Sequence, residues 1–149
     1  MSSNSKKREK SPPIINFSTI GDPDVRAAAK MFSGKNECQA IELYALVPQA
    51  GAEIFFLPSD LARTYYLQAA FTYLRCEESA EDSDFVGALL SAVRLISEES
   101  GDVCAETINT CTQILKFLRI AIARFDVEVV IHRLNSIEEL LKRFENKEA

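Results

Sequence analysis

Apolar residues recur with helical spacing along the C-terminal half of the chain. Between residues 102 and 125 they are alternately four and three positions apart, at Cys104, Ile108, Cys111, Leu115, Leu118, Ile122 and Phe125. This heptad spacing predicts the apolar face of one helix over 102–125. Both cysteines fall within the pattern, so we interpret them as small apolar residues of a helix core.

A second apolar pattern follows after residue 126 in a different register. Its members are Val127, Val130, Leu134, Ile137, Leu141 and Phe144. One continuous helix would turn this second face away from the first. We therefore expect a break near Asp126, which can cap a new helix, and an antiparallel helical hairpin with a short link.

Two further helices are predicted upstream, over 59–76 and 84–99. Each is apolar around most of its circumference and has one narrow polar stripe. The stripes consist of Thr64, Gln68, Thr72 and Arg75 in the first helix, and of Gly87, Ser91, Arg94 and Glu98 in the second. An acidic segment joins the two helices, with Ser83 as the expected N-cap of the second.

Helical signals in the N-terminal half are shorter. Asp22 as N-cap, Pro23 at the first helical position and Gly34 after the end predict one short helix, and a second is expected from Asn36 to about Val47. Residues 52–58 are expected to be helical or irregular. The prediction is an all-α, compact bundle of five or six helices, a single domain over 14–149. A pair of hairpins of the HEAT or armadillo kind is the alternative, because a shift that places Asp60 on Asp102 loosely aligns the apolar positions.

Composition fits one ordinary globular domain. The chain has 149 residues, of which 47% are hydrophobic and 26% charged. No apolar run approaches the roughly 20 residues that span a bilayer, and no apolar segment follows the basic N-terminus. We therefore expect no membrane insertion. We also expect a cytoplasmic or nuclear protein, whose four cysteines remain thiols.

The formal charge of −5 is unevenly distributed. The first 13 residues are polar and basic and end in Pro12-Pro13, so they are predicted to be a disordered tail, whereas the remainder is acidic. An acidic body argues against nucleic-acid binding. Within the tail, Lys6, Lys7, Arg8 and Lys10 resemble a nuclear-import cluster, and Ser11 precedes a proline as in proline-directed phosphorylation sites. A terminus without a function is the alternative.

Catalytic chemistry is hard to assemble from this sequence. His132 is the single histidine and falls on the polar face of the last helix. Nucleotide-binding, hydrolase and zinc-protease motifs are missing, the cysteines have no short metal-ligand spacing, and the acidic segment lacks the spacing of a calcium loop. We therefore predict no catalytic, cofactor-binding or metal-binding residues, and a non-enzymatic adaptor or complex subunit. A helical enzyme or small-ligand carrier with a site between helices is the alternative, which an enclosed pocket with converging polar groups would favour.

One helix face contains an exception that points to a partner. The polar face of helix 102–125 holds Asn109, Thr112, Gln113, Lys116, Arg119 and Arg124. Ile120 projects into the middle of this face, with Phe117 near its edge. Either another helix of the chain covers Ile120, or these two residues dock a protein, with Lys116, Arg119 and Arg124 as a basic rim. Such a rim favours an acidic partner, for example the acidic segment of a second copy in a homo-oligomer.

Overall fold

Helices make up all the regular structure in the part of the chain that is described. The computed structural model describes residues 11–125 and 130–148. Its α-helices are α1 (Pro23–Phe32), α2 (Glu37–Leu46), α3 (Ala50–Glu53), α4 (Asp60–Leu74), α5 (Ser83–Glu98), α6 (Ala105–Ala121) and α7 (Val130–Glu148). The described residues thus contain one α-helix more than the upper expected number. The addition is α3, a single turn too short to show a periodicity.

The first two helices begin where local side chains satisfy the free backbone N–H groups. Asp22 accepts hydrogen bonds from the N–H groups of Asp24 and Val25, at 2.8 and 3.3 Å. Asn36 and Gln39 each accept from the backbone N–H of the other, at 2.9 Å, which is a complete capping box. Both helix starts therefore confirm the sequence prediction.

Two expectations from the sequence are wrong: the N-cap residue of α5 and the burial of Cys104. The N-cap of α5 is Asp82, whose side chain accepts from the N–H of Phe85 at 3.2 Å, and Ser83 is the first helical residue. Cys104 is exposed and precedes α6, whereas Cys111 is buried. Cys104 is the N-cap residue of α6 with an extended backbone, so it precedes the helix whose face is buried, and its N–H donates to Asp60 at 2.9 Å.

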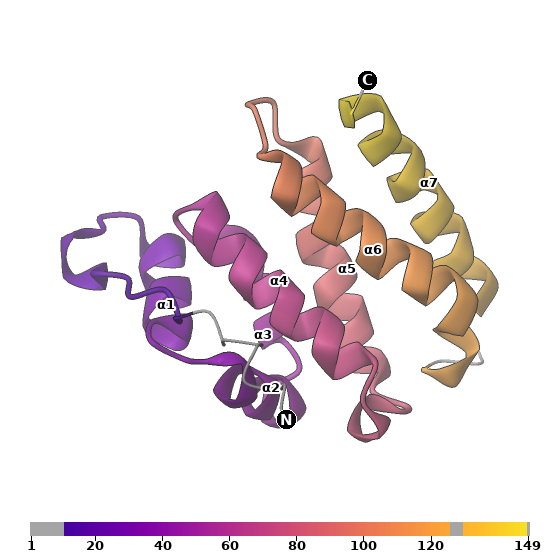
Figure 1. Ribbon diagram of the computed structural model, residues 1–149, viewed down its shortest axis with the longest axis horizontal. Coiled ribbons are helices and arrows are strands. Elements are labelled where there is room, and N and C mark those ends of the chain that lie inside the picture. The colour runs from indigo at the N-terminus through magenta and orange to yellow at the C-terminus, as the bar shows by residue number, and fades with distance from the viewer. Residues whose placement is uncertain (1–10, 126–129, 149) are drawn as a thin grey trace, which may run out of the picture.

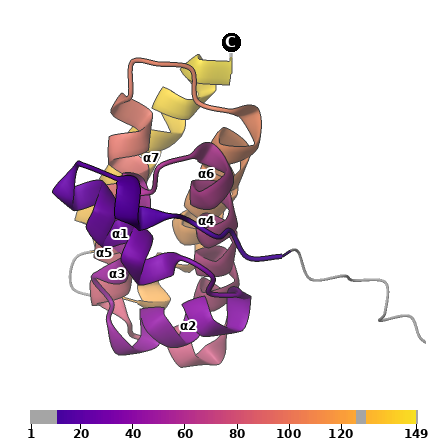
Figure 2. The ribbon, with the colours of Figure 1, turned by 90° about the vertical axis from the view of Figure 1, so that its left-hand side faces the viewer.

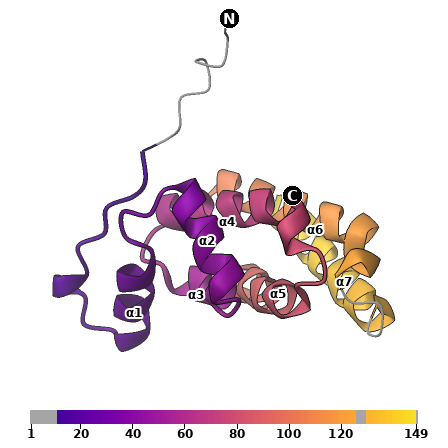
Figure 3. The same cartoon turned by 90° about the horizontal axis from the view of Figure 1, so that it is seen from below.

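Helices alternate between two layers. α2, α4 and α6 pack side by side in one layer, while α5 packs between α3 and α7 in the other (Figures 1 and 3). Figure 2 shows α1 and α2 at the N-terminal end of this stack. The described residues thus form the compact all-α fold that the sequence predicts, with successive hairpins next to one another.

α6 and α7 form the antiparallel hairpin that the change of register predicts. The two helices pack together (Figure 1). Arg119 on α6 pairs with Glu138 on α7. α6 ends at Ala121 and continues as a 3₁₀ turn through Arg124. The expected cap, Asp126, lies outside the described residues.

One apolar cluster runs through all of these helices. It extends from Ala28 and Phe32 in α1 to Phe144 in α7. Buried tyrosines fasten the helices to one another: Tyr44 donates to the carbonyl of Tyr66 at 2.8 Å, and Tyr66 donates to the carbonyl of Phe32 at 2.6 Å. Among the described residues, no helix is both long and apolar enough to cross a bilayer.

The predicted tail meets this body at its last residue. The carbonyl of Pro13 accepts from the N–H of Gly34 at 2.9 Å, and the N–H of Ile15 donates to the Ser33 hydroxyl at 2.8 Å. Gly34 has a φ of +77°, a left-handed conformation that glycine adopts without strain. The turn after α1 thus also holds residues 13–15 against the body of the protein.

Candidate partner-binding surface

α4 and α6 lie parallel, and residues from both line up along their contact. Near their starts, the hydroxyls of Thr64 and Thr107 are 2.7 Å apart and buried. Further along, the rings of Phe71 and Phe117 meet edge to face, with centroids 5.8 Å apart. The expected polar stripe on α4 is therefore wrong at Thr64, because α6 covers it.

Arg124 fixes the far end of this helix pair. Its guanidinium donates to the carbonyl of Leu74 at 2.7 Å and also to the carbonyl of Cys76. These carbonyls belong to the C-terminal end of α4, where backbone acceptors lack helical partners. Arg124 is half-buried there, so we do not count it in the basic rim that the sequence suggested.

Ile120 stands on the outward face of α6 and is 86% exposed. Its exposed neighbours along the helix include Gln113, Lys116 and Ala123. Of the two possibilities that the sequence left open, cover by another helix and exposure, the described residues show exposure. The described part of the chain therefore buries little of this isoleucine.

Aromatic residues extend the apolar area from Ile120 toward α4. Phe117 is half-buried and lies against Phe71, and the guanidinium carbon of Arg75 is 4.2 Å from the centroid of the Phe71 ring. Such a stacked arginine is a cation–π contact that still presents its charge to solvent. Phe71 and Arg75 were not part of the sequence hypothesis, since only the packing of α4 on α6 brings them to Phe117.

Positive charge surrounds this area. Lys116 is exposed, and Arg119 pairs with Glu138 at 3.5 Å across an exposed contact. Exposed ion pairs of this kind contribute about 0–1 kcal/mol, so a partner carboxylate can replace Glu138 at little cost. We call the set Phe71, Arg75, Lys116, Phe117, Arg119 and Ile120 the Ile120 surface.

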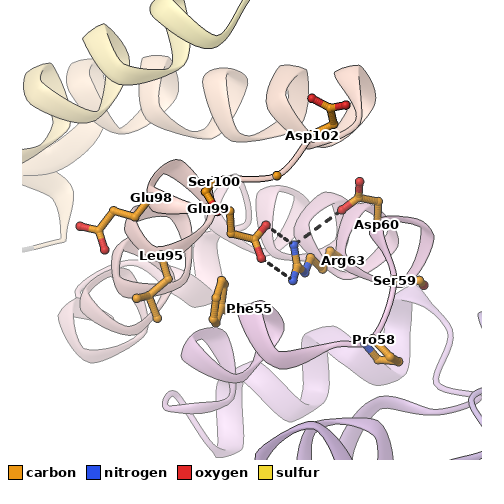
Figure 4. A pocket seen from close by; sticks show the side chains of 11 residues that line it. Phe55, Pro58, Ser59, Asp60, Arg63, Leu95, Glu98, Glu99, Ser100 and Asp102 are labelled. Atoms are coloured by element: carbon orange, nitrogen blue, oxygen red, sulfur yellow. Dashed lines mark hydrogen bonds and ion pairs between the residues drawn. The ribbon is translucent and has the colours of Figure 1, made fainter.

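A cleft of about 580 Å³ lies elsewhere, between the start of α4 and the α5–α6 connection (Figure 4). Arg63 donates to both carboxylate oxygens of Glu99, at 2.7 and 3.0 Å, and lies 3.6 Å from Asp60. Figure 4 shows these groups directed at one another. The arginine charge is thus balanced by the protein's own carboxylates, and the contacts tie α4 to the α5–α6 connection.

The remaining residues that the sequence singled out lie apart from the Ile120 surface. Ser11 is exposed and lines a small apolar pocket with Leu61 and Tyr65. His132 is exposed on α7. Lys6, Lys7, Arg8 and Lys10 lie outside the described residues. Within 11–125 and 130–148, no three His, Cys, Asp or Glu side chains are grouped as metal ligands.

Comparisons of the chain with protein-family models, with curated proteins and with solved structures found no match.

Proposed function

We propose that this protein is a non-enzymatic interaction module, an adaptor or a subunit of a larger complex. The observation that carries the proposal is the exposure of Ile120 beside the Phe71–Phe117 pair. Burying an aliphatic side chain of this size contributes about 1.5–3 kcal/mol, and none of the residues in 11–125 and 130–148 provides that burial. An apolar centre with a polar rim is the usual anatomy of a protein interface.

The partner we infer is a protein segment rich in carboxylates. Arg75, Lys116 and Arg119 surround the apolar centre, whereas the whole chain carries a net charge of −5. The basic rim attracts acidic groups to this surface, whereas the acidic charge of the rest of the protein repels them elsewhere. The acidic segment of a second copy, which contains Glu77, Glu78 and Glu81, is one such sequence.

Ile120→Asp tests the surface, with Leu46→Asp as its matched control. Leu46 is 82% exposed on α2, so both substitutions place a carboxylate on an exposed helical position of the same layer. Both variants should keep wild-type helicity and melting temperature. Partners are captured from the native cell with each protein and identified by mass spectrometry, and self-association is measured by sedimentation.

Only Ile120→Asp should lose the partner or the self-association, and Lys116→Glu should weaken the same interaction. Binding by wild type should also fall as salt rises, because the rim charges become screened. Retention of every captured protein and of the oligomeric state by Ile120→Asp would rule out this surface.

For the tail, we propose nuclear import that phosphorylation of Ser11 modulates. The support is the basic cluster before Ser11 and the exposure of Ser11 itself. Ser11 shares a pocket with Asp60 and Glu106, so an added phosphate of about −2 would be repelled and would loosen this segment. Changing Lys6, Lys7, Arg8 and Lys10 to alanine should move a tagged protein out of the nucleus. An unchanged distribution of the tagged protein would contradict the import proposal.

A further inference from the structure

α4 and α6 present one continuous face to solvent. The two helices run parallel, with contacts between them near their starts and at their ends (Figure 1). Residues seven positions apart lie on nearly the same side of a helix. The outward side is marked by Leu61 and Ile120, which are 77% and 86% exposed. We call the two rows of residues on this side the α4–α6 face, which consists of Leu61, Gln68 and Arg75 along α4 and of Glu106, Gln113 and Ile120 along α6.

An apolar pocket of about 350 Å³ lies at the end of this face where both helices start. Leu61 and Cys104 line it from the two helices, and Ser11 and Pro13 line it from the N-terminal segment. Leu61 is as little covered by the described residues as Ile120 is. The α4–α6 face therefore has an exposed aliphatic side chain at each end, and at one end a pocket beside it.

The middle of the α4–α6 face is uncharged. Gln68 and Gln113 are the central residues of the two rows. Phe71 and Phe117 pack edge to face at the junction of the helices, between this middle part and Ile120. Covering a charged group would cost desolvation, whereas an amide costs less to cover and an aromatic ring contributes apolar area. The strip between the two ends can thus be covered by an apolar partner surface.

The other end of the face, where both helices end, is basic. Arg75 stacks on the Phe71 ring, and Lys116 is exposed. Among the described residues, neither Arg75 nor Lys116 is in an ion pair, in contrast to Arg119, which pairs with Glu138. Acidic residues are favoured in the first turn of a helix, where the helix dipole is positive. A helix lying antiparallel to α4 and α6 would bring its first turn to this basic end.

The length of the α4–α6 face matches a short helix. Leu61 and Arg75 are fourteen positions apart, which corresponds to about 21 Å along α4. A partner helix of about four turns covers this distance with one apolar stripe, and such helices commonly bind between the helices of another protein.

We propose that the α4–α6 face binds one amphipathic helix of a partner protein, lengthwise and antiparallel to α4 and α6. Carboxylates of its first turn lie over Arg75 and Lys116, its apolar stripe covers Ile120 and the Phe71–Phe117 pair, and an apolar side chain of its last turn enters the pocket beside Leu61. This inference rests on the docking proposed at Ile120, and it adds the form and the direction of the docked segment.

Selection from a displayed library of random peptides of about 18 residues, with the full-length protein as bait, tests the occupant. Enriched peptides should have apolar residues three and four positions apart over about four turns, and acidic residues near the N-terminus. A synthetic copy of the most enriched peptide should become helical on binding, with a dissociation constant of about 10 μM or below. No enrichment, or enrichment of peptides without this spacing, would overturn the proposal.

Leu61→Asp separates a lengthwise helix from docking at Ile120 alone. Binding of the synthetic peptide should weaken at least about tenfold in Leu61→Asp and in Ile120→Asp, because each places a carboxylate under the apolar stripe. Leu46→Asp, on an equally exposed position of α2, should leave the affinity unchanged. Circular dichroism checks the fold, and Gln68→Glu, in the middle of the face, replaces Leu61→Asp if that variant unfolds.

Alkylation of the native thiols gives a second measurement. At saturation the peptide should protect Cys104, which lines the pocket, while Cys38, which is exposed on α2, keeps its rate. A loss of binding in Ile120→Asp alone, with Cys104 still reactive, would refute the lengthwise helix and leave the Ile120 surface in place. Unchanged binding in both Leu61→Asp and Ile120→Asp would refute the α4–α6 face as the site of the helix, whatever the captured partner shows at Ile120.

Discussion

Replacing Thr64 by valine removes one hydroxyl of the buried Thr64–Thr107 pair and changes little else. Valine has nearly the shape of threonine and a similar helix propensity, so packing between α4 and α6 is kept. The two hydroxyl oxygens are 2.7 Å apart, and their residues are only 5% and 0% exposed. The Thr107 hydroxyl left behind retains only the Cys104 sulfur, at 3.4 Å, as a weak partner.

The magnitude follows from the cost of an unpaired buried hydroxyl. Such a group costs about 1–3 kcal/mol, whereas exchanging both partners for apolar groups of the same shape is nearly neutral. We therefore expect Thr64→Val and Thr107→Val each to lower the free energy of unfolding by about 1–2 kcal/mol. The double variant should lose less than either single variant, which gives a coupling of about 2 kcal/mol between the positions.

Urea unfolding followed by far-UV circular dichroism measures this cycle. With slopes of about 1–3 kcal/mol per molar urea, each single substitution shifts the midpoint by roughly 1 M, well above measurement error. Equal slopes in all four proteins show that the comparison concerns stability alone. Additive losses in the double variant would refute the reasoning, because they would show that each hydroxyl acts independently of the other.

Three other predictions use the same assay or simple labelling. Arg124→Met should lower the free energy of unfolding by about 1–3 kcal/mol, because it removes the charged donor from the carbonyls of Leu74 and Cys76, which keep Ser79 as a donor. Arg119→Met should change it by about 0.5 kcal/mol or less; similar losses in both would contradict the capping role. Burial raises the pKa of Cys111 to about 12, so in the folded protein an alkylating reagent should modify exposed Cys38 and Cys104 while Cys111 reacts only after unfolding. The pKa of this thiol in the unfolded chain is near its ordinary value of 9.0, so above pH 9.0 the unfolded chain binds fewer protons than the folded protein. The free energy of unfolding should therefore fall as the pH rises further. Urea midpoints that stay constant in this pH range would contradict the prediction.

Local signals account for most of the helices. Asp22 and Asn36 cap the helices that follow them using groups within three residues, and such contacts can be recognised in any sequence. The apolar spacing of 108–125 likewise predicts a buried face, which the structure confirms from Ile108 to Phe125. Both signals are short in range, because a helix is defined by contacts three and four residues apart.

Contacts between distant residues explain the failures. Thr64 was assigned to a polar stripe, yet its hydroxyl partner lies 43 residues further along the chain. Arg124 was assigned to a surface rim, but its acceptors lie 50 and 48 residues away. A helical projection gives the direction of a side chain and cannot show what another helix places in front of it.

The same distinction between contacts within one helix and contacts between distant residues applies to the Ile120 surface. The sequence predicts Ile120 on a polar helix face, because the direction of a side chain depends on its own helix alone. Its exposure, and the additions of Phe71 and Arg75, depend on where α4 packs against α6. Four of its six residues could therefore be predicted from periodicity, and the other two, Phe71 and Arg75, required the arrangement of the layers.

The alternation of helices between two layers also sets the order in which parts of the protein open. α4 and α5 have a packed helix on both flanks within their layers, whereas α7 has neighbours only on one side of the stack. In stacked architectures, stability spreads from neighbour to neighbour, so amide hydrogens should exchange slowest in the middle and fastest toward the ends. The Ile120 surface then belongs partly to the slow-exchanging centre, which makes it a rigid platform for docking.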